Sequence, residues 1–265
     1  MGNNRINGEI MISVILSAGM GNRLRPLTND IPKPLLEINN MTLLERMIRN
    51  CMDVDINKFI IVVGYNKEKV INFSKKLEEK YNISIEIVEN NRYDVTNTSV
   101  STYLASSHIQ EHELDDFLII NGDNVVDPEL IAKIASRKNT SMTIDNFKDL
   151  NEESFKLIIS NKSLSENNSI ACGIIKEIGK EIDIESSTGE FIGISKVAKN
   201  DISNFNEILA RLIKEDEQNY YDFAYKELSS LTKIDFVLTN GLKWTEIDDK
   251  HDWEQAHILI NEFEC

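Results

Sequence analysis

A glycine-rich segment that carries basic side chains follows the first apolar stretch of the chain. Gly19 and Gly21 allow a sharp turn after the apolar run 11–16, and such a turn exposes backbone N–H groups that can bind an anion. Arg23 and Lys33 add positive charge to the same segment. This combination predicts a polyphosphate site, in which the cations also stabilise charge that shifts as a phosphoryl bond breaks.

Two other glycine-rich phosphate signatures do not fit this segment. A dinucleotide fingerprint requires a third small residue where this chain has Leu24, and it continues directly into a helix, which Pro26, Pro32 and Pro34 prevent. The Gly-Lys-Ser/Thr tripeptide of a Walker loop is absent from the chain. We therefore expect an irregular loop from Ser17 to about Pro34, and a loop of that length is usually functional.

Two carboxylates stand at positions where they could hold a metal ion. Asp123 follows the apolar run 117–120, so it lies at the carboxyl end of a predicted parallel strand, where such sheets bind ligands. Asp248 lies in the segment W-T-E-I-D-D before the last predicted helix. Each supplies a hard oxygen ligand suited to Mg²⁺. The alternatives are a turn residue for Asp123 and a helix cap for Asp248 with Asp249.

These segments resemble the signature of the nucleotidyltransferases that make NDP-sugars and CDP-alcohols. The loop reads L-S-A-G-M-G-N-R-L-R-P-L-T followed by P-K-P, and W-T-E-I-D resembles a further segment of the family. The resemblance implies that Arg23, Lys33 and Asp123 are catalytic and that Asp123 and Asp248 bind Mg²⁺. It also implies a nucleotide site formed by Leu16, Ala18, Gly19, Met20, Gly21, Asn22, Arg23, Lys33, Asn97, Ser99 and Gly122.

Base and acceptor residues come from segments in which the resemblance is shorter. Asn97 and Ser99 lie in a stretch that resembles the CTP:phosphocholine cytidylyltransferase branch rather than UTP and dTTP enzymes; a helix-capping stretch is the alternative. Lys180 and Glu190 lie in segments that resemble the family's G-K and G-E-(Y/F)-x-G. This implies an acceptor phosphate at Lys180 and an acceptor ammonium at Glu190. Trp244 is a candidate for contact with a quaternary ammonium.

The resemblance predicts a Mg²⁺-dependent cytidylyltransferase that transfers CMP from CTP to phosphoglutamine or phosphocholine, releases pyrophosphate and serves the decoration of surface polysaccharides. No general base is needed, because an acceptor phosphate with a second pKa near ~6 is largely dianionic at neutral pH. Two alternatives stay open. One is a sugar-1-phosphate uridylyl-, thymidylyl- or guanylyltransferase, and the other is a non-catalytic nucleotide-sensing subunit of the same fold.

Apolar runs that alternate with amphipathic segments predict an α/β fold. The resemblance makes this a Rossmann-like nucleotidyltransferase fold with a mixed, mainly parallel central sheet flanked by helices. We expect one domain over 1–265, with a nucleotide-binding half at about 11–137 and an acceptor-binding half at about 138–265. The predicted strands are 11–16, 58–63, 83–87, 117–120, 141–144, 156–159, 170–174 and 190–195. The predicted helices are 44–51, 70–77, 98–109, one that follows a cap at Asp127-Pro128, 202–215, 222–231 and one that carries Trp253, Ala256 and Ile260.

Composition excludes several classes of partner. The net charge of −15 argues against nucleic acid and against an anionic membrane surface. No apolar run approaches transmembrane length, and residues 1–10 lack the apolar core of a signal peptide. Cys51, Cys172 and Cys265 are far apart and form no metal-binding pattern, so we expect reduced thiols in a cytoplasmic protein. The sequence indicates no oligomeric state.

Overall fold

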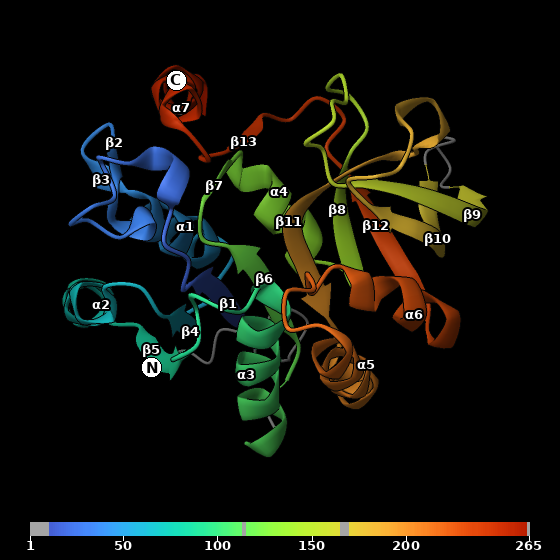
Figure 1. The fold of residues 1–265 in the computed structure, drawn as a ribbon, viewed down its shortest axis with the longest axis horizontal. Coiled ribbons are helices and arrows are strands. Elements are labelled where there is room, and N and C mark those ends of the chain that lie inside the picture. Colours follow the sequence, from blue (N-terminus) through green and yellow to red (C-terminus); the bar gives the residue numbers. More distant parts are fainter. Residues whose placement is uncertain (1–10, 113–114, 165–169, 264–265) are drawn as a thin grey trace.

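The computed structural model describes residues 11–112, 115–164 and 170–263 (Figure 1). The N-terminal segment and Cys265, on which part of the expectation about localisation depends, lie outside these ranges. Within the described ranges, no helix combines the length and the apolar character needed to cross a bilayer.

Within these residues, nine strands form one sheet in the order β5-β4-β1-β6-β11-β8-β12-β10-β9. The first four in this order pair in parallel. Their bounds are Ile12–Ser17 for β1, Lys58–Val63 for β4, Ser84–Glu89 for β5 and Phe117–Asn121 for β6. The other five are β8 (Ser141–Asp145), β9 (Lys156–Leu164), β10 (Ile170–Gly179), β11 (Gly189–Val197) and β12 (Ile234–Leu238).

The predicted mixed sheet is confirmed, but it is not mainly parallel: among the described residues, four neighbouring strand pairs are parallel and four are antiparallel, and the parallel pairs are concentrated in the nucleotide half. Beyond β6, only β8 and β12 pair in parallel; the other pairs are antiparallel. No α-helix separates β8, β9, β10 and β11 in the described part of the chain. Parallel neighbours require long crossovers, usually helical, so strands that succeed one another without helices pair antiparallel.

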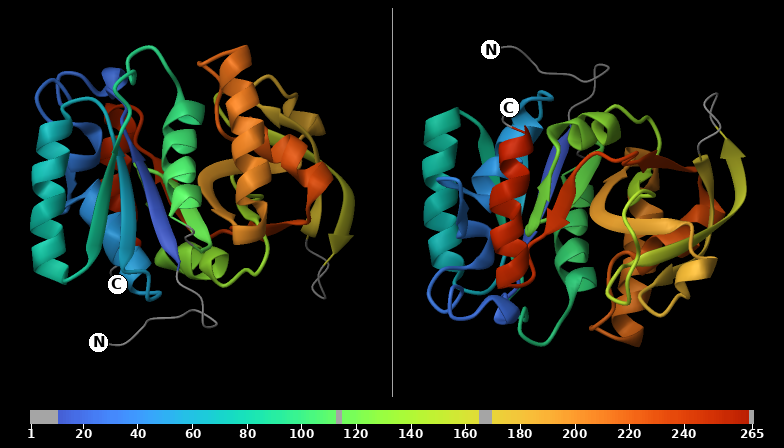
Figure 2. Two further views of the ribbon diagram at one scale, coloured as in Figure 1. Left: turned by 90° about the horizontal axis from the view of Figure 1, so that it is seen from below. Right: turned by 90° about the horizontal axis from the view of Figure 1, so that it is seen from above.

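Helices cover both faces of the sheet, because adjacent residues of a strand point to opposite faces. Val14 packs into one layer and Ile15 into the other. The first layer contains α3 (Thr98–Glu111), α5 (Ile202–Glu215) and α6 (Phe223–Leu231). The second contains α1 (Leu43–Met52), α2 (Lys67–Tyr81) and α4 (Pro128–Ala135). Figure 2 shows the first layer from below, with α3 and α5 side by side.

A small third core lies beyond the carboxyl ends of the parallel strands. It packs Leu24 and Leu36 of the glycine-rich segment against Ala256 and Ile260 of α7 (Lys250–Phe263). Two short antiparallel pairs complete it, namely β2 (Glu37–Ile38) with β3 (Met41–Thr42) and β7 (Asn124–Val126) with β13 (Trp244–Glu246). The pairing of β7 with β13 brings the segment before α7 next to the end of β6.

Every predicted strand and helix is present, with bounds that differ by a few residues. The predicted loop contains no α-helix and includes two single 3₁₀ turns, Asn22–Leu24 and Lys33–Leu35. The prediction missed β12, which is buried between β8 and β10. It also missed the four strands of two or three residues, which are too short to show periodicity.

Candidate active site

The glycine-rich loop folds back on itself after β1. Gly21 has a φ of +61°, and a Cβ there would lie 3.2 Å from Thr28 Cγ2, so the position favours glycine. Thr28 Oγ1 donates a hydrogen bond of 2.7 Å to the carbonyl oxygen of Gly21. This contact closes the first part of the loop and lets Lys33 reach the edge of the sheet.

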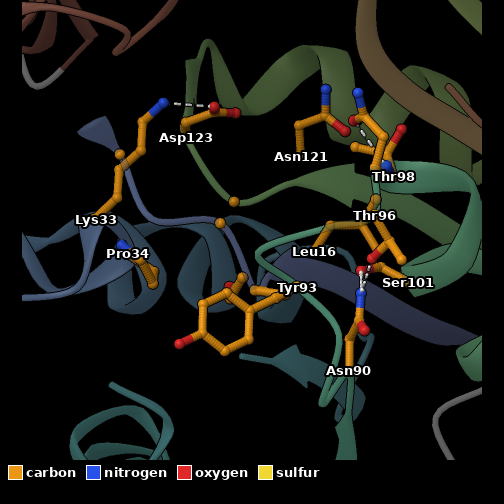
Figure 3. Close-up of a pocket in the computed structure, with 16 residues that line it drawn as sticks. Leu16, Lys33, Pro34, Asn90, Tyr93, Thr96, Thr98, Ser101, Asn121 and Asp123 are labelled. Carbon is orange, nitrogen blue, oxygen red and sulfur yellow. Dashed lines mark hydrogen bonds and ion pairs between the residues drawn. The ribbon is translucent and has the colours of Figure 1, made fainter. Parts of the chain in front are cut away.

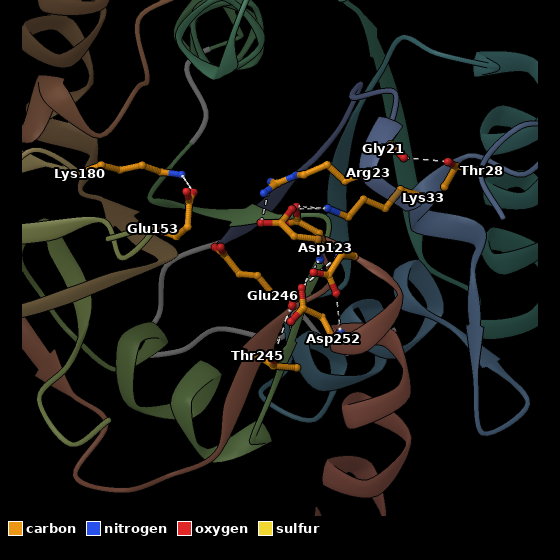
Figure 4. Close-up of polar contacts among 12 residues, drawn as sticks. Gly21, Arg23, Thr28, Lys33, Asp123, Glu153, Lys180, Thr245, Glu246 and Asp252 are labelled. Atoms are coloured by element: carbon orange, nitrogen blue, oxygen red, sulfur yellow. Dashed lines mark hydrogen bonds and ion pairs between the residues drawn. The ribbon is translucent and has the colours of Figure 1, made fainter. Parts of the chain in front are cut away.

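Two carboxylates from distant parts of the chain converge on Lys33 (Figure 4). Lys33 Nζ lies 2.7 Å from Asp123 Oδ2 and 3.1 Å from Asp248 Oδ1. The Arg23 guanidinium lies 2.9 Å from the other oxygen of Asp248. The cluster therefore contains the three residues predicted to be catalytic, Arg23, Lys33 and Asp123, together with Asp248. Lys33 and Asp248 are 215 residues apart in the sequence.

Burial and charge shift the pKa values in this cluster. Burial lowers the pKa of Lys33, but the charges of Asp123 and Asp248 outweigh it, so the pKa lies above its ordinary value. Burial raises the pKa of Asp248, but the charge and hydrogen bond of Lys33 outweigh it, so the pKa is lowered. Burial and then the charge of Asp123 raise the pKa of Glu246 to about 8. At neutral pH, Lys33 and Asp248 are thus both charged.

The acidic residues that cap helices are not the ones that contact Lys33. Asp249 Oδ1 accepts from the N–H of Asp252 at 3.0 Å, and Asp252 Oδ2 accepts from the N–H of Asp249 at 3.1 Å. This is the reciprocal arrangement of a capping box at the start of α7. Asp127 likewise caps α4. Asp249 therefore caps its helix while the side chain of Asp248 faces Lys33.

The donor set fits a magnesium ion. Asp123 and Asp248 each direct a carboxylate oxygen at the same cation, which in this structure is the Lys33 ammonium. Within the described residues, no group of three or more His, Cys, Asp or Glu side chains could hold a metal ion. Mg²⁺ keeps several waters and is commonly bound by one or two carboxylates together with substrate phosphates. Asp123 and Asp248 would therefore hold it only as a partial set, completed by phosphate and water.

A cavity of about 200 Å³ opens between the glycine-rich loop and the end of β6 (Figure 3). Seven of the residues predicted to bind the nucleotide line it: Leu16, Ala18, Gly19, Gly21, Lys33, Asn97 and Gly122. A Cβ at Gly122 would lie 2.4 Å from the carbonyl oxygen of Leu16, so this glycine lets the ends of β1 and β6 close the floor of the cavity. We call this space the loop cavity.

The other predicted nucleotide residues lie elsewhere. Met20 and Asn22 do not line the loop cavity, and Arg23 lines the neighbouring cavity described below. Ser99 is fully buried, and Ser101, two residues further along α3, lines the loop cavity in its place. Asn97 also caps α3, since its side chain accepts from the N–H of Thr98 at 2.8 Å.

A second cavity, of about 580 Å³, adjoins the first and shares Thr98, Asn121 and Asp123 with it. We call it the acceptor-side cavity, because residues from the second half of the chain form most of its wall. Asp123 lies where the two cavities meet. The arrangement can therefore hold a polyphosphate in one cavity and bring a second molecule to it from the other.

All three predicted acceptor residues line the acceptor-side cavity. Lys180 forms an ion pair of 2.7 Å with Glu153, and this charge helps to raise its pKa against the effect of burial. Burial raises the pKa of Glu190. Trp244 is 6% exposed and donates from Nε1 to Asp145 Oδ2 at 2.6 Å.

Three further residues of this cavity were not predicted. Glu246 and Lys148 line it, and so does Asp222, whose Oδ1 is buried without a hydrogen-bond partner among the described residues. Burial raises the pKa of Asp222 to about 8. Glu246 stands inside the recognised W-T-E-I-D segment, which could have signalled it, whereas Lys148 and Asp222 carry no motif. None of the four histidines lines either cavity.

This fold, with cations and carboxylates that meet between two cavities, is the arrangement expected of a nucleotide-transferring enzyme. A family model described as nucleotidyl transferase matches residues 12–170, well over half of the chain. The chain belongs to the nucleotidyl transferase family, which confirms the predicted resemblance.

Two curated relatives match most of this chain. The bifunctional protein GlmU of Methanococcus aeolicus is 32% identical over 253 residues, 95% of this chain and 55% of that protein. The CTP:phosphoglutamine cytidylyltransferase of Campylobacter jejuni is 27% identical over 256 residues, 92% of this chain and 98% of that protein. The chain spans about half the length of several curated relatives that it matches.

Solved structures show the same fold. The CTP:phosphocholine cytidylyltransferase of Streptococcus pneumoniae has a TM-score of 0.70 with 22% identity, and the match covers 95% of this chain and 99% of that one. The predicted Rossmann-like nucleotidyltransferase fold is therefore confirmed.

Proposed function

We propose that this protein is a Mg²⁺-dependent cytidylyltransferase, which transfers CMP from CTP to a small phosphorylated acceptor and releases pyrophosphate. One observation carries the proposal. The loop cavity and the acceptor-side cavity meet at Asp123, with Lys33, Arg23 and Asp248 at the junction. Two anionic substrates entering from opposite sides would meet at this cluster of cations and carboxylates.

The chain's own residues supply positioning and charge. The loop backbone, Lys33 and Arg23 would hold the triphosphate, and Asp123 with Asp248 would hold Mg²⁺, which neutralises charge on the α-phosphate and on the leaving pyrophosphate. An oxygen of the acceptor phosphate forms the new bond to the α-phosphorus, and the bond to the bridging oxygen breaks. No proton has to move, in keeping with the absence of histidine from both cavities.

CTP and a nitrogen-bearing acceptor are the substrates that we favour. Glu190, Asp222 and Glu246 place three carboxyl groups in the acceptor-side cavity. Burial raises the pKa of each, and a bound ammonium would favour their ionised forms, whereas a neutral sugar would not. The extended similarity to a CTP:phosphoglutamine cytidylyltransferase agrees with this choice. We favour phosphoglutamine, giving CDP-glutamine, over phosphocholine, and a role in decorating surface polysaccharides.

One alternative has a specific observation in its favour. The similarity to the UTP–glucose-1-phosphate uridylyltransferase AglF of Haloferax volcanii, 31% identical over 45% of this chain, favours transfer to a sugar 1-phosphate. A non-catalytic nucleotide-sensing subunit is disfavoured, because the two carboxylates and two cations that meet at the junction have no evident use in a pure sensor.

A panel of four nucleoside triphosphates against phosphoglutamine, phosphocholine and hexose 1-phosphates tests the proposal by Mg²⁺-dependent release of pyrophosphate. We expect release only with CTP and an amino phosphate. Release with UTP, dTTP or GTP and a hexose 1-phosphate would establish the alternative. No release with any pair would refute the proposed catalytic role. Labelled CTP without acceptor should leave no nucleotidylated protein, because attack on the α-phosphorus is direct.

A further inference from the structure

Lys148 places a positive charge on Trp244, a candidate ring for contact with a cationic acceptor. Four other aromatic side chains line the same cavity, namely Phe155, Phe191, Tyr220 and Tyr221. Lys148 Nζ lies 4.1 Å from the centre of the Trp244 ring and donates to the carbonyl oxygen of Trp244 at 3.1 Å. Trp244 is 6% exposed and belongs to the core of the second helix layer. Little of its ring therefore remains for a quaternary ammonium, and a second cation there would be repelled by Lys148.

A buried carboxylate fixes this arrangement. Asp145, 3% exposed, accepts from Trp244 Nε1 at 2.6 Å and from Thr239 Oγ1 at 2.7 Å. It also accepts from the N–H of Phe147 at 2.9 Å, next to Lys148 in the chain. Asp145 thus holds both the ring and the backbone that leads to Lys148. Lys148 and Trp244 are therefore held in place in the wall of the acceptor-side cavity.

The other cations of the acceptor-side cavity are already paired. Lys180 lies 2.7 Å from Glu153, and Arg23 lies 2.9 Å from Asp248. In the described part of the chain, no carboxylate lies within ion-pair distance of Lys148. Its nearby acidic neighbour in the cavity is Glu190, whose pKa burial raises and the charge of Lys148 lowers. Lys148 is therefore the lining cation that has no direct ion pair and can take a new anion.

We propose that Lys148 binds a carboxylate of the acceptor, so that the acceptor is a phosphorylated amino acid rather than a phosphorylated choline. The inference rests on the proposed function and assigns the residue that distinguishes an amino-acid acceptor from choline. The acceptor amine then lies against the acidic side of the cavity, which Glu190 and Glu246 line. A carboxylate on Lys148 gains a charge-assisted hydrogen bond, and an ammonium beside Glu190 favours the ionised form of that carboxyl group.

Phosphoserine and phosphoethanolamine form the test pair, because they differ only in the carboxylate. With CTP, we expect the wild-type protein to have the higher kcat/KM for phosphoserine. Lys148→Met should lower the ratio of the two kcat/KM values by about tenfold or more, the usual scale for losing a hydrogen bond to a charged group. Lys148→Arg, which keeps the cation, should retain most of the preference. Lys133→Met, on the distant helix α4, is the matched control and should leave the ratio unchanged.

The outcomes separate this inference from the proposed function. If the wild-type protein uses both amino phosphates and Lys148→Met leaves their ratio unchanged, the inference is wrong and the proposed function stands. Faster turnover of phosphocholine than of phosphoserine by the wild-type protein would also overturn it. If only hexose 1-phosphates are used, the proposed acceptor class fails, and this inference fails with it.

Discussion

Lys33 carries one charge that two carboxylates share. Its side chain is 12% exposed, and those of Asp123 and Asp248 are 27% and 32% exposed, so water screens the three groups only in part. Removal of any one member leaves an uncompensated charge in a partly buried place. Substitutions here are therefore expected to affect function and local electrostatics together, and each requires a stability measurement beside the rate.

Asp123→Asn should lower turnover on the order of a hundredfold or more, because it keeps the size of the side chain and loses the charge that would hold the metal. The measurement is the initial rate of pyrophosphate release at saturating Mg²⁺, together with a thermal melt that checks the fold. Asp53→Asn, at the exposed end of α1, is the control and should match the wild-type rate. Near-wild-type Mg²⁺-dependent turnover by Asp123→Asn would show that the metal assignment is wrong.

Asp222 makes stability depend on pH. Burial raises its folded-state pKa to about 8, well above the value of an unfolded aspartate. Between about pH 4 and pH 8 the folded state therefore binds a proton that the unfolded state does not. The contribution to stability is full below this window and is lost as the pH rises through it, by up to about 1.4 kcal/mol per pH unit.

Asp222→Asn removes this titration. The free energy of unfolding of the variant minus that of the wild-type protein should therefore increase from pH 5 to pH 8. Urea denaturation of both proteins at the two pH values measures the difference. The comparison cancels the other groups that titrate in the same range, such as Glu246. A difference between the two proteins that does not change with pH would contradict the assignment.

At the scale of elements, the β7–β13 pair and helix α7 decide where Asp248 lies. Glu246 pairs with Asn124 in this ladder, and the N–H of Ile247 donates to the carbonyl oxygen of Asp123 at 3.0 Å. The capping box then begins α7 at the next turn of the chain. The short ladder and the cap together hold Asp248 against Lys33.

Asp249→Ala should lower the free energy of unfolding by about 1 kcal/mol, since it removes the N-cap of α7. Its turnover should stay within several-fold of the wild-type value. Asp248→Asn should show the opposite profile, a large loss of turnover with an intact helix. Denaturant unfolding and pyrophosphate release on both variants separate the roles. Equal losses of turnover in the two variants would contradict the division between cap and ligand.

Long elements with a clear period were predictable from the sequence. The apolar run at β1 predicted a strand, and the spacing of Leu44, Met47, Ile48 and Cys51 predicted the helix α1. Both predictions were possible because the pattern of apolar residues along a short segment shows which faces of the element are buried. The strand β12 was missed, although Ile234, Phe236 and Val237 are buried in it. It is only five residues long and follows directly on α6, so local pattern did not separate it from the helix.

Site residues were predictable where a motif carries them. Arg23, Lys33, Asp123 and Asp248 converge as the resemblance implied. Lys148 and Asp222 were not foreseen, because they reach the same cavity from separate segments and only the tertiary fold brings them together. The choice of Ser99 over Ser101 depended on which face of α3 meets the cavity, and one helical sequence leaves that open.

At the scale of the whole molecule, one sheet joins the two expected halves. β6 of the nucleotide half pairs with β11 of the acceptor half, and the larger core contains residues of both, such as Ile119 and Phe205. We therefore expect a single cooperative unfolding transition, as for one domain. Far-UV circular dichroism, which follows the whole backbone, and the fluorescence of Trp244 and Trp253, both in the second half, should give one midpoint. Two separated midpoints would divide the chain into independent units.

The ammonium of Lys33 has a consequence for the proposed metal site. It lies between the two carboxylates and, together with Arg23, balances their charge, so a divalent ion would have to displace it. In the proposed reaction, the phosphates of a nucleotide would offer Lys33 and Arg23 other anions and so release the carboxylates. We therefore expect binding of the metal and binding of the nucleotide to be thermodynamically linked.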